Sequence, residues 1–241
     1  MRIEKFDSLE STNKYCEALD LVQVEDFTCY WALAQTAGIG QRGNHWEAAP
    51  GQNLTFSLIL HPLFLPADRQ FKLTQALSLA LLDFLKDFRD LKDLKVKWPN
   101  DIYVVGRKIC GTLISTRLSG NSIASAVCGI GININQTLFP DWVPNPTSLA
   151  LLTGQQYELE PLLQQLLGCI ERRYNELMSG IDPELEYLEH LLNLGVPACY
   201  KYNEREIVAT INGIDTHGRL LLTTSDGCRL CCGMKEIALL P

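Results

Sequence analysis

A glycine-rich loop at residues 34–51 constrains the fold of this 241-residue chain more than any other feature. The loop holds four glycines, one arginine and one tryptophan, namely Gly38, Gly40, Gly43, Gly51, Arg42 and Trp46. Glycines let successive backbone N–H groups converge on an anion, because no side chain keeps the ligand away. The sequence therefore predicts a phosphate-binding loop, and the alternative is a surface loop without a ligand.

The segments on either side of the loop exclude a dinucleotide-binding fold. The first three glycines have the dinucleotide spacing, which also requires a preceding strand and a helix directly afterwards. Residues 28–34 are rich in β-forming side chains and supply that strand, which brings Gln35 to the mouth of the loop. No helix can follow, because Pro50 interrupts it and residues 53–60 alternate apolar and polar side chains, as a second strand does. The loop therefore joins two strands.

Helices and antiparallel hairpins are expected over residues 68–193. Apolar side chains recur at helical spacing between Leu73 and Phe88, which predicts a helix that Asp68 caps and that covers one face of a sheet. Short turns predict antiparallel hairpins for the strands expected at 94–98, 102–105, 109–116 and 123–134. Two more helices are predicted to begin at Pro161 and Pro183.

The pattern changes after Leu194. Short β-forming runs then alternate with hairpin signals such as Asn212-Gly213 and Asp226-Gly227. The remaining length suits about five short strands, which is enough for a small barrel that docks on the rest of the molecule. We therefore predict one domain over residues 1–194 and a second over residues 195–241.

Charge and composition narrow the classes of partner. The net charge of −7 argues against nucleic acid as a main partner, because binding to nucleic acid requires a basic surface. The nine cysteines are scattered through apolar segments, and Cys228-x-x-Cys231 lacks the second pair that a zinc site needs, so buried reduced thiols are expected. No signal segment or membrane-spanning run is present, which predicts a soluble cytoplasmic protein without membrane contact.

Three polar motifs outside the loop carry candidate functional side chains. Lys97-Trp98-Pro99-Asn100-Asp101, followed by Lys108 and Gly111, brings cations, an amide and a carboxylate around one turn, although a solvated hairpin is the simpler alternative. Ser11-Thr12-Asn13 precedes an expected helix, so its hydroxyls can cap that helix or contact a ligand. Asn133 follows an apolar strand, where a buried amide must find hydrogen-bond partners.

Together with Gln35-Thr36-Ala37-Gly38 and Gly129-Ile130-Gly131-Ile132-Asn133, these motifs resemble the biotin protein ligases in order and separation. The resemblance extends from Ser11 to the C-terminal segment. It implies an α+β fold, in which a mixed-sheet catalytic domain similar to that of class II aminoacyl-tRNA synthetases precedes an SH3-like barrel. It also implies that ATP and Mg²⁺ activate biotin as biotinyl-5'-AMP, and that biotin then passes to a lysine of a biotin carboxyl carrier protein or of a carrier domain in a biotin-dependent carboxylase.

The resemblance also implies roles for individual residues. Catalysis would involve Lys108, Arg42 and Asp101. Biotin would contact Ser11, Thr12, Asn13, Gln35, Gly38, Lys108 and Gly111. The nucleotide would contact Gly38, Gly40, Gln41, Arg42, Gly43, Trp46, Asn100 and Asn133. Lys108 is the cation expected between the biotin carboxylate and the α-phosphate, and Mg²⁺ would arrive with ATP because it commonly needs only one protein carboxylate besides phosphates.

Two departures from the family pattern are evident. Many members carry arginines where this chain has Ile39 and Gln41, so we expect weaker retention of biotinyl-adenylate and a slower release of it after Gln41→Arg. Repressor-type members carry a DNA-binding domain ahead of the catalytic domain, whereas this chain reaches Ser11 almost at once, so a short form without a role in transcription is expected.

Two other functions are also compatible with the sequence. Lipoate protein ligases share the implied fold and chemistry, but their loop of two arginines and three glycines is not found. A noncatalytic biotin or nucleotide sensor could use the same pocket, although Lys108 favours an enzyme. The motifs do not distinguish a monomer from a homodimer and do not identify the acceptor protein.

Overall fold

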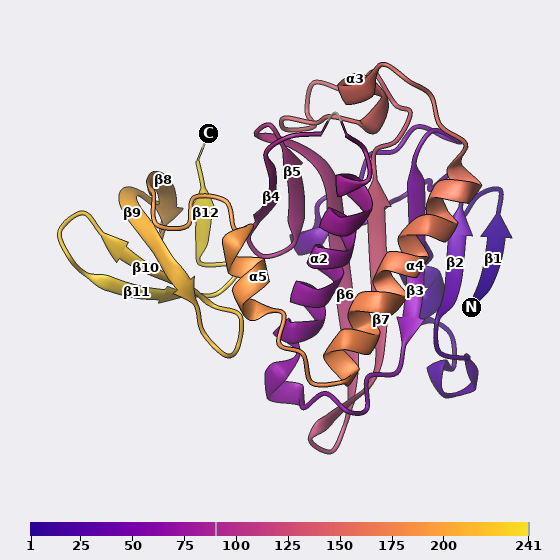
Figure 1. Ribbon diagram of the computed structural model, residues 1–241, viewed down its shortest axis with the longest axis horizontal. Helices are drawn as coiled ribbons and strands as arrows, with labels where there is room; N and C mark the ends of the chain where they lie inside the picture. The colour runs from indigo at the N-terminus through magenta and orange to yellow at the C-terminus, as the bar shows by residue number, and fades with distance from the viewer. Residues whose placement is uncertain (90, 241) are drawn as a thin grey trace.

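A seven-stranded mixed sheet forms the larger part of the computed structural model, which describes residues 1–89 and 91–240 apart from the Arg42 side chain (Figure 1). Its strands lie in the order β1-β2-β3-β7-β6-β5-β4. They are β1 (Arg2–Phe6), β2 (Thr28–Ala32), β3 (Leu54–Leu60), β4 (Leu94–Lys97), β5 (Asp101–Val104), β6 (Arg107–Ser119) and β7 (Ser122–Ile132). β1 and β2 are parallel and the other neighbours are antiparallel, which confirms the predicted hairpins.

Helices pack on the two faces of this sheet. They are α1 (Thr12–Glu17), α2 (Phe71–Lys86), α3 (Leu149–Thr153), α4 (Leu159–Met178) and α5 (Glu184–Glu189). Figure 1 shows α2 and α4 side by side across one face. α1 packs on β3 and β7 from the other face, where Cys16, Ile59 and Val127 form a smaller apolar cluster. None of the described helices has the length and apolarity that crossing a bilayer requires.

The alternation in β3 sorts its side chains between these two faces. Leu54, Phe56, Leu58 and Leu60 belong to the main core beneath α2 and α4. Ile59 belongs to the smaller cluster, and Ser57 reaches side chains at the start of α1. The predicted period of two is confirmed. It leaves a buried polar row on the α1 face.

A second sheet is formed by the C-terminal part of the chain. Its strands, all antiparallel in the order β11-β10-β9-β8-β12, are β8 (Pro197–Tyr202), β9 (Arg205–Ile214), β10 (Leu220–Thr224), β11 (Arg229–Cys232) and β12 (Ile237–Leu239). Figure 1 shows it beside β4, β5 and α5. The α+β class is confirmed, whereas division into domains 1–194 and 195–241 stays a prediction.

Hydrogen bonds from two aromatic side chains, Trp98 and Tyr187, join the Lys97–Asp101 turn to the second sheet and to α5. Trp98 Nε1 donates to the Gly218 carbonyl at 2.9 Å, in the turn before β10. Tyr187 of α5, which is fully buried, donates its hydroxyl to the Pro99 carbonyl at 2.8 Å. Gly218 also packs on Phe71, because a Cβ there would lie 2.2 Å from the ring. The Lys97–Asp101 turn is therefore held in place by the second sheet and by α5, which lie outside the large sheet.

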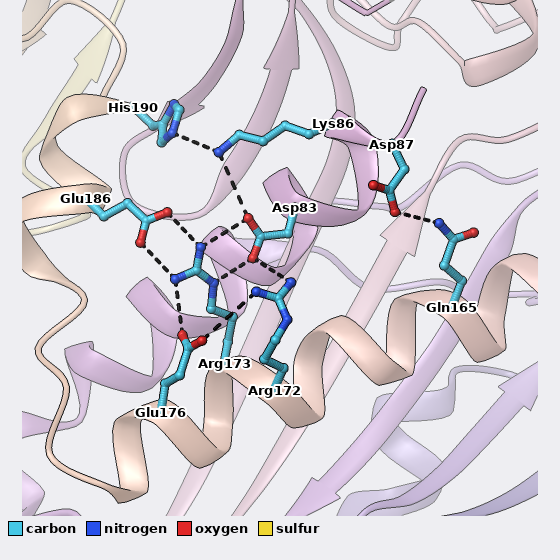
Figure 2. A network of polar contacts seen from close by, with 9 residues as sticks. All are labelled: Asp83, Lys86, Asp87, Gln165, Arg172, Arg173, Glu176, Glu186 and His190. Carbon is cyan, nitrogen blue, oxygen red and sulfur yellow. Dashed lines mark hydrogen bonds and ion pairs between the residues drawn. The ribbon is translucent and has the colours of Figure 1, made fainter. Parts of the chain in front are cut away.

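An ionic network ties α5 to α2 and α4 (Figure 2). Arg173 of α4 donates to both oxygens of Asp83 on α2, at 2.6 and 3.0 Å. It also donates to both oxygens of Glu186 on α5, at 2.6 and 2.8 Å. The hydrogen bond to Asp83 raises the pKa of the Arg173 guanidinium above its ordinary value, so the charge is permanent.

Some expectations about local structure are wrong. Asp68 does not cap α2, because it lies in a 3-10 turn (Ala67–Arg69) and Gln70 precedes the helix. β7 ends at Ile132, and the backbone N–H of Asn133 turns to the Ile109 carbonyl. Of the nine free cysteines, Cys199, Cys228 and Cys231 are exposed rather than buried.

Candidate active site

A cavity of about 300 Å³ opens where the large sheet, the glycine-rich loop and the second sheet meet. It gathers most of the predicted site residues, namely Ser11, Thr12, Asn13, Gln35, Gly40, Gln41, Trp46, Asp101, Lys108 and Gly111. Gly38, Gly43, Asn100 and Asn133 are not among its lining residues. The side chain of Arg42 lies outside the described part of the chain. Segments about 100 residues apart in sequence, α1 and β6, thus meet at one site.

Lys108 and Asp101 form the charged end of the cavity. The ammonium of Lys108 donates to Asp101 Oδ2 at 2.7 Å, and each side chain is 27% exposed. The Lys108 ammonium lies 5.7 Å from the centre of the Trp46 ring. Gly111 makes room for this group, because a Cβ there would lie 3.1 Å from the Trp46 ring and 3.3 Å from Lys108. The spacing Lys108-x-x-Gly111 is therefore a packing requirement.

Lys97 adds a second cation beside this pair. Its ammonium lies 3.4 Å from the Tyr103 hydroxyl, to which it donates. Burial lowers the pKa of Lys97 and neighbouring Lys108 lowers it further, while Asp101 opposes both effects. Burial also raises the pKa of Tyr103 to about 12, which keeps that hydroxyl neutral. Lys97 belongs to the charged sequence motif, but the sequence alone indicated no role for it.

The start of α1 forms the neutral polar end of the cavity. Ser11 caps the helix by accepting from the Lys14 N–H, so capping and cavity lining are both observed for this residue. The Thr12 N–H donates to Gln35 Oε1 at 2.7 Å, which holds the Gln35 amide against the helix. Neutral donors and acceptors at this end suit an uncharged polar ligand group.

Two glycines of β7 form the floor between these ends. A Cβ at Gly129 would lie 1.8 Å from Asn13 Oδ1, and one at Gly131 would lie 2.3 Å from the Trp46 ring. Both glycines therefore allow a side chain to lie directly on the strand. In the sequence, Gly129 and Gly131 were recognised only as part of a family motif, although residues two apart in a strand lie on one face.

Asn100 and Asn133 are buried next to the site rather than in it. Asn100 Nδ2 donates to the Thr112 carbonyl at 2.7 Å, and Asn133 Nδ2 donates to the Thr147 carbonyl at 2.9 Å. Within the described residues, the Oδ1 atom of each has no partner. Contact between either amide and a nucleotide stays a prediction.

The second sheet lines part of the cavity, which sequence reasoning missed. Its contribution is mainly apolar and consists of Tyr200, Ile211, Leu220, Ile237, Ala238 and Leu239. Gln41 of the glycine-rich loop also lies 4.0 Å from the sulfur of Met234, between β11 and β12. No local sequence pattern marks these residues, because only the docking of the two sheets brings them to the loop.

The fold and the cavity define a mixed-sheet α+β domain that holds a lysine–carboxylate pair opposite a neutral polar pocket. Residues 5–133, more than half of the chain, match the model of the biotin/lipoate A/B protein ligase family. The chain belongs to this family.

Individual relatives extend the match beyond that segment. The chain is 31% identical to the bifunctional ligase/repressor BirA of Bacillus subtilis over 226 residues, which cover 92% of this chain and 69% of that protein. It is 31% identical to the biotin–(acetyl-CoA-carboxylase) ligase of Paracoccus denitrificans over 202 residues, covering 80% and 83%. The biotin protein ligase of Aquifex aeolicus in complex with biotin and ATP has the same fold, with a TM-score of 0.81, 24% identity and coverage of 99% and 98%.

Proposed function

We propose that this chain is an ATP-dependent biotin ligase, which forms biotinyl-5'-AMP and transfers biotin to a lysine of a carrier domain. The observation that carries the proposal is the placement of Lys108 and the Thr12–Gln35 pair in one cavity, with Trp46 between the loop and the sheet. Named relatives that are biotin ligases support it. The cavity has a charged end for the reacting groups and a neutral end for the bicyclic ring of biotin.

In the first step an oxygen of the biotin carboxylate attacks the α-phosphorus of ATP. A bond forms between that oxygen and phosphorus, and pyrophosphate leaves. Two anions must approach each other, so a fixed cation between them lowers the barrier. Lys108 supplies that cation, and its 2.7 Å bond to Asp101 orients the ammonium. Lys97 adds a second positive charge to the cavity lining, close enough to Lys108 for the two charges to interact.

The other roles follow from the positions of the remaining groups. Thr12 and Gln35 would bind the ureido group of biotin, and the indole of Trp46 would pack on the adenylate. Backbone N–H groups of the glycine-rich loop would hold phosphate oxygens. Mg²⁺ fits only as a companion of ATP, because Asp101 is the carboxylate that lines the described cavity and a single carboxylate suffices beside phosphates.

In the second step the amine of the acceptor lysine attacks the carbonyl carbon of biotinyl-adenylate. The amide bond forms, AMP leaves with the electrons of the broken carbon–oxygen bond, and the amine loses a proton. The acceptor is proposed to be the carrier domain of a biotin-dependent carboxylase such as acetyl-CoA carboxylase. A cytoplasmic location without a nucleic-acid partner is part of the same proposal.

Release of pyrophosphate from ATP tests the first step and separates the alternatives. The protein is incubated with MgATP and either biotin, lipoate or no acid, and pyrophosphate is measured. We expect release only with biotin. Release with lipoate alone would favour a lipoate ligase. Tight biotin binding without any pyrophosphate would favour a sensor and contradict the proposal.

A further inference from the structure

A buried serine joins the two residues that begin α1. Ser57 of β3 is fully buried, and its Oγ lies 2.8 Å from Thr12 Oγ1 and 2.7 Å from Asn13 Oδ1. Both neighbours are buried and line the cavity, with exposed fractions of 3% each. A serine hydroxyl has one proton and can donate only once. Ser57 therefore donates to only one of these two oxygens, and it accepts from the other group.

The amide of Asn13 settles the first bond. The Leu113 carbonyl can only accept, so the Asn13 atom that lies 3.3 Å from it is Nδ2. Oδ1 then faces Ser57, and it lies so close to Gly129 that a Cβ there would be 1.8 Å away. Among the described residues, Ser57 is the donor within reach of this oxygen. Cys16 is a third hydrogen-bonding neighbour of Ser57, but its sulfur is a weak acceptor. The proton of Ser57 consequently lies between Ser57 and Asn13, because two buried oxygens at 2.7 Å otherwise repel each other.

The second bond follows from the first. With the Ser57 proton committed to Asn13, the 2.8 Å contact between Ser57 and Thr12 needs the proton of Thr12. Thr12 then has no proton for Gln35 Oε1, which lies 3.2 Å from its hydroxyl. The Thr12 N–H can only donate, so the Gln35 atom facing it at 2.7 Å is the amide oxygen. Thr12 Oγ1 and Gln35 Oε1 are thus two neighbouring acceptors at the cavity.

We infer that Ser57 is a positioning residue that turns Thr12 into a hydrogen-bond acceptor, so that the pocket selects a ligand carrying an N–H donor. The inference rests on the proposed function, since the cyclic urea of biotin offers two such donors. Ser57 itself is not among the residues that line the cavity. It acts through Thr12, whose lone pairs it aims at the cavity. A ring with an ether or ester oxygen in place of the N–H would place acceptor against acceptor.

Removing the Ser57 hydroxyl reverses this arrangement. In Ser57→Ala the Thr12 proton loses its acceptor and turns to Gln35 Oε1, into the space that the ligand N–H needs. We expect the dissociation constant of biotin to rise about tenfold, the scale of one hydrogen bond. The KM for ATP should stay within about twofold, because the charged end of the cavity is unchanged.

Discrimination between ligands separates this role from a merely structural one. The probes are biotin and its two carbamate analogues, in each of which oxygen replaces one ring N–H. We expect the unmodified protein to prefer biotin by about a hundredfold, and Ser57→Ala to narrow that preference, because the freed Thr12 hydroxyl can donate to the ring oxygen. Ser57→Cys keeps a weak donor and should fall between the two, which also covers the case in which Ser57→Ala folds poorly.

Ser78→Ala is the matched control. Ser78 is fully buried on α2 and donates to the Thr74 carbonyl at 2.8 Å, so its loss removes a buried hydroxyl without changing Thr12. Biotin affinity and preference should stay as in the unmodified protein. An unchanged preference in both Ser57 variants would overturn the inference, as would equal losses for biotin and ATP. An unmodified protein that releases no pyrophosphate with biotin would overturn the proposed function and this inference with it.

Discussion

At the scale of single residues, Lys108 and Asp101 account for the chemistry because they are paired yet still reach the cavity. A surface ion pair of this length would contribute little to stability. Here the pair lies at a cavity wall beside Trp46, with Gly111 leaving space for both side chains. Its main effect is to keep a cation at a fixed point where negative charge must accumulate.

Replacing Lys108 tests that role directly. In Lys108→Ala we expect biotin-dependent pyrophosphate release to fall at least about a thousandfold, comparable to the loss of a group that stabilises transition-state charge. Biotin binding should remain, because the neutral end of the cavity is intact. Lys92→Ala, at an exposed lysine, is the control. Full turnover in Lys108→Ala would rule out the assignment.

The floor of the cavity gives a second residue-scale prediction. Gly131→Ala places a methyl group 2.3 Å from the present position of the Trp46 ring, so the indole must leave the strand. We expect nucleotide affinity to fall by about tenfold or more and the tryptophan fluorescence to shift. Gly168→Ala on α4 has no atom within 4 Å of the new group and should stabilise the protein by about 0.5–1 kcal/mol. Unchanged nucleotide binding in Gly131→Ala would contradict the proposed packing of Trp46.

At the scale of elements, periodicity in the sequence predicted the strands and helices whose side chains alternate or recur at regular spacing. The alternation over β3 separates apolar side chains in the main core from polar side chains that are buried on the α1 face. The helical spacing in α2 marks the residues that pack in the main core. The start of α2 was missed because the chain first makes a 3-10 turn at Asp68. The cavity lining from β10 and β12 was also missed, since contacts between distant segments leave no local pattern.

The glycine motif in β7 was predicted only in part. Gly129 and Gly131 were recognised only as part of a family motif, and the sequence did not show which side chains would lie on them. That information requires the position of α1 and of the loop, which come from other parts of the sequence. Lys108 and Asp101 were both expected to act in catalysis, whereas their packing beside Trp46 and Gly111 was not predicted.

The ionic network between α2, α4 and α5 gives a prediction at this scale. Arg173→Met removes the shared partner of Asp83 and Glu186 and should destabilise the protein by about 3 kcal/mol. For a chain of this size the melting temperature should fall by about 6–12 °C. Arg172→Met is the control, because that side chain is 52% exposed and should change stability by less than about 0.5 kcal/mol. Equal melting temperatures for the two variants would contradict the importance assigned to Arg173.

At the scale of the whole molecule, the two sheets meet at the charged motif. The hydrogen bond from Trp98 to Gly218 and the one from Tyr187 to Pro99 hold the turn that precedes Asp101. The second sheet also supplies cavity lining. Docking of the second sheet and formation of the active site are therefore expected to be coupled.

Trp98→Phe tests this coupling. The loss of one donor should speed backbone hydrogen exchange in the turn before β10 by about tenfold, since an intramolecular hydrogen bond contributes about 0.5–1.5 kcal/mol. Adenylate formation should slow as the turn loosens. Trp142→Phe, at a tryptophan that is 56% exposed, should change neither. Faster exchange without any loss of adenylate formation would show that the two sheets act independently.

Transfer of biotin to protein is the most direct measurement of the central claim. A biotin carrier domain is incubated with this protein, biotin and MgATP, beside reactions that contain lipoate or lack ATP, and its intact mass is determined. We predict a gain of one biotinyl group only where biotin and ATP are both present. A carrier domain that gains a lipoyl group instead, or one that stays unmodified while no pyrophosphate is released, would contradict the account.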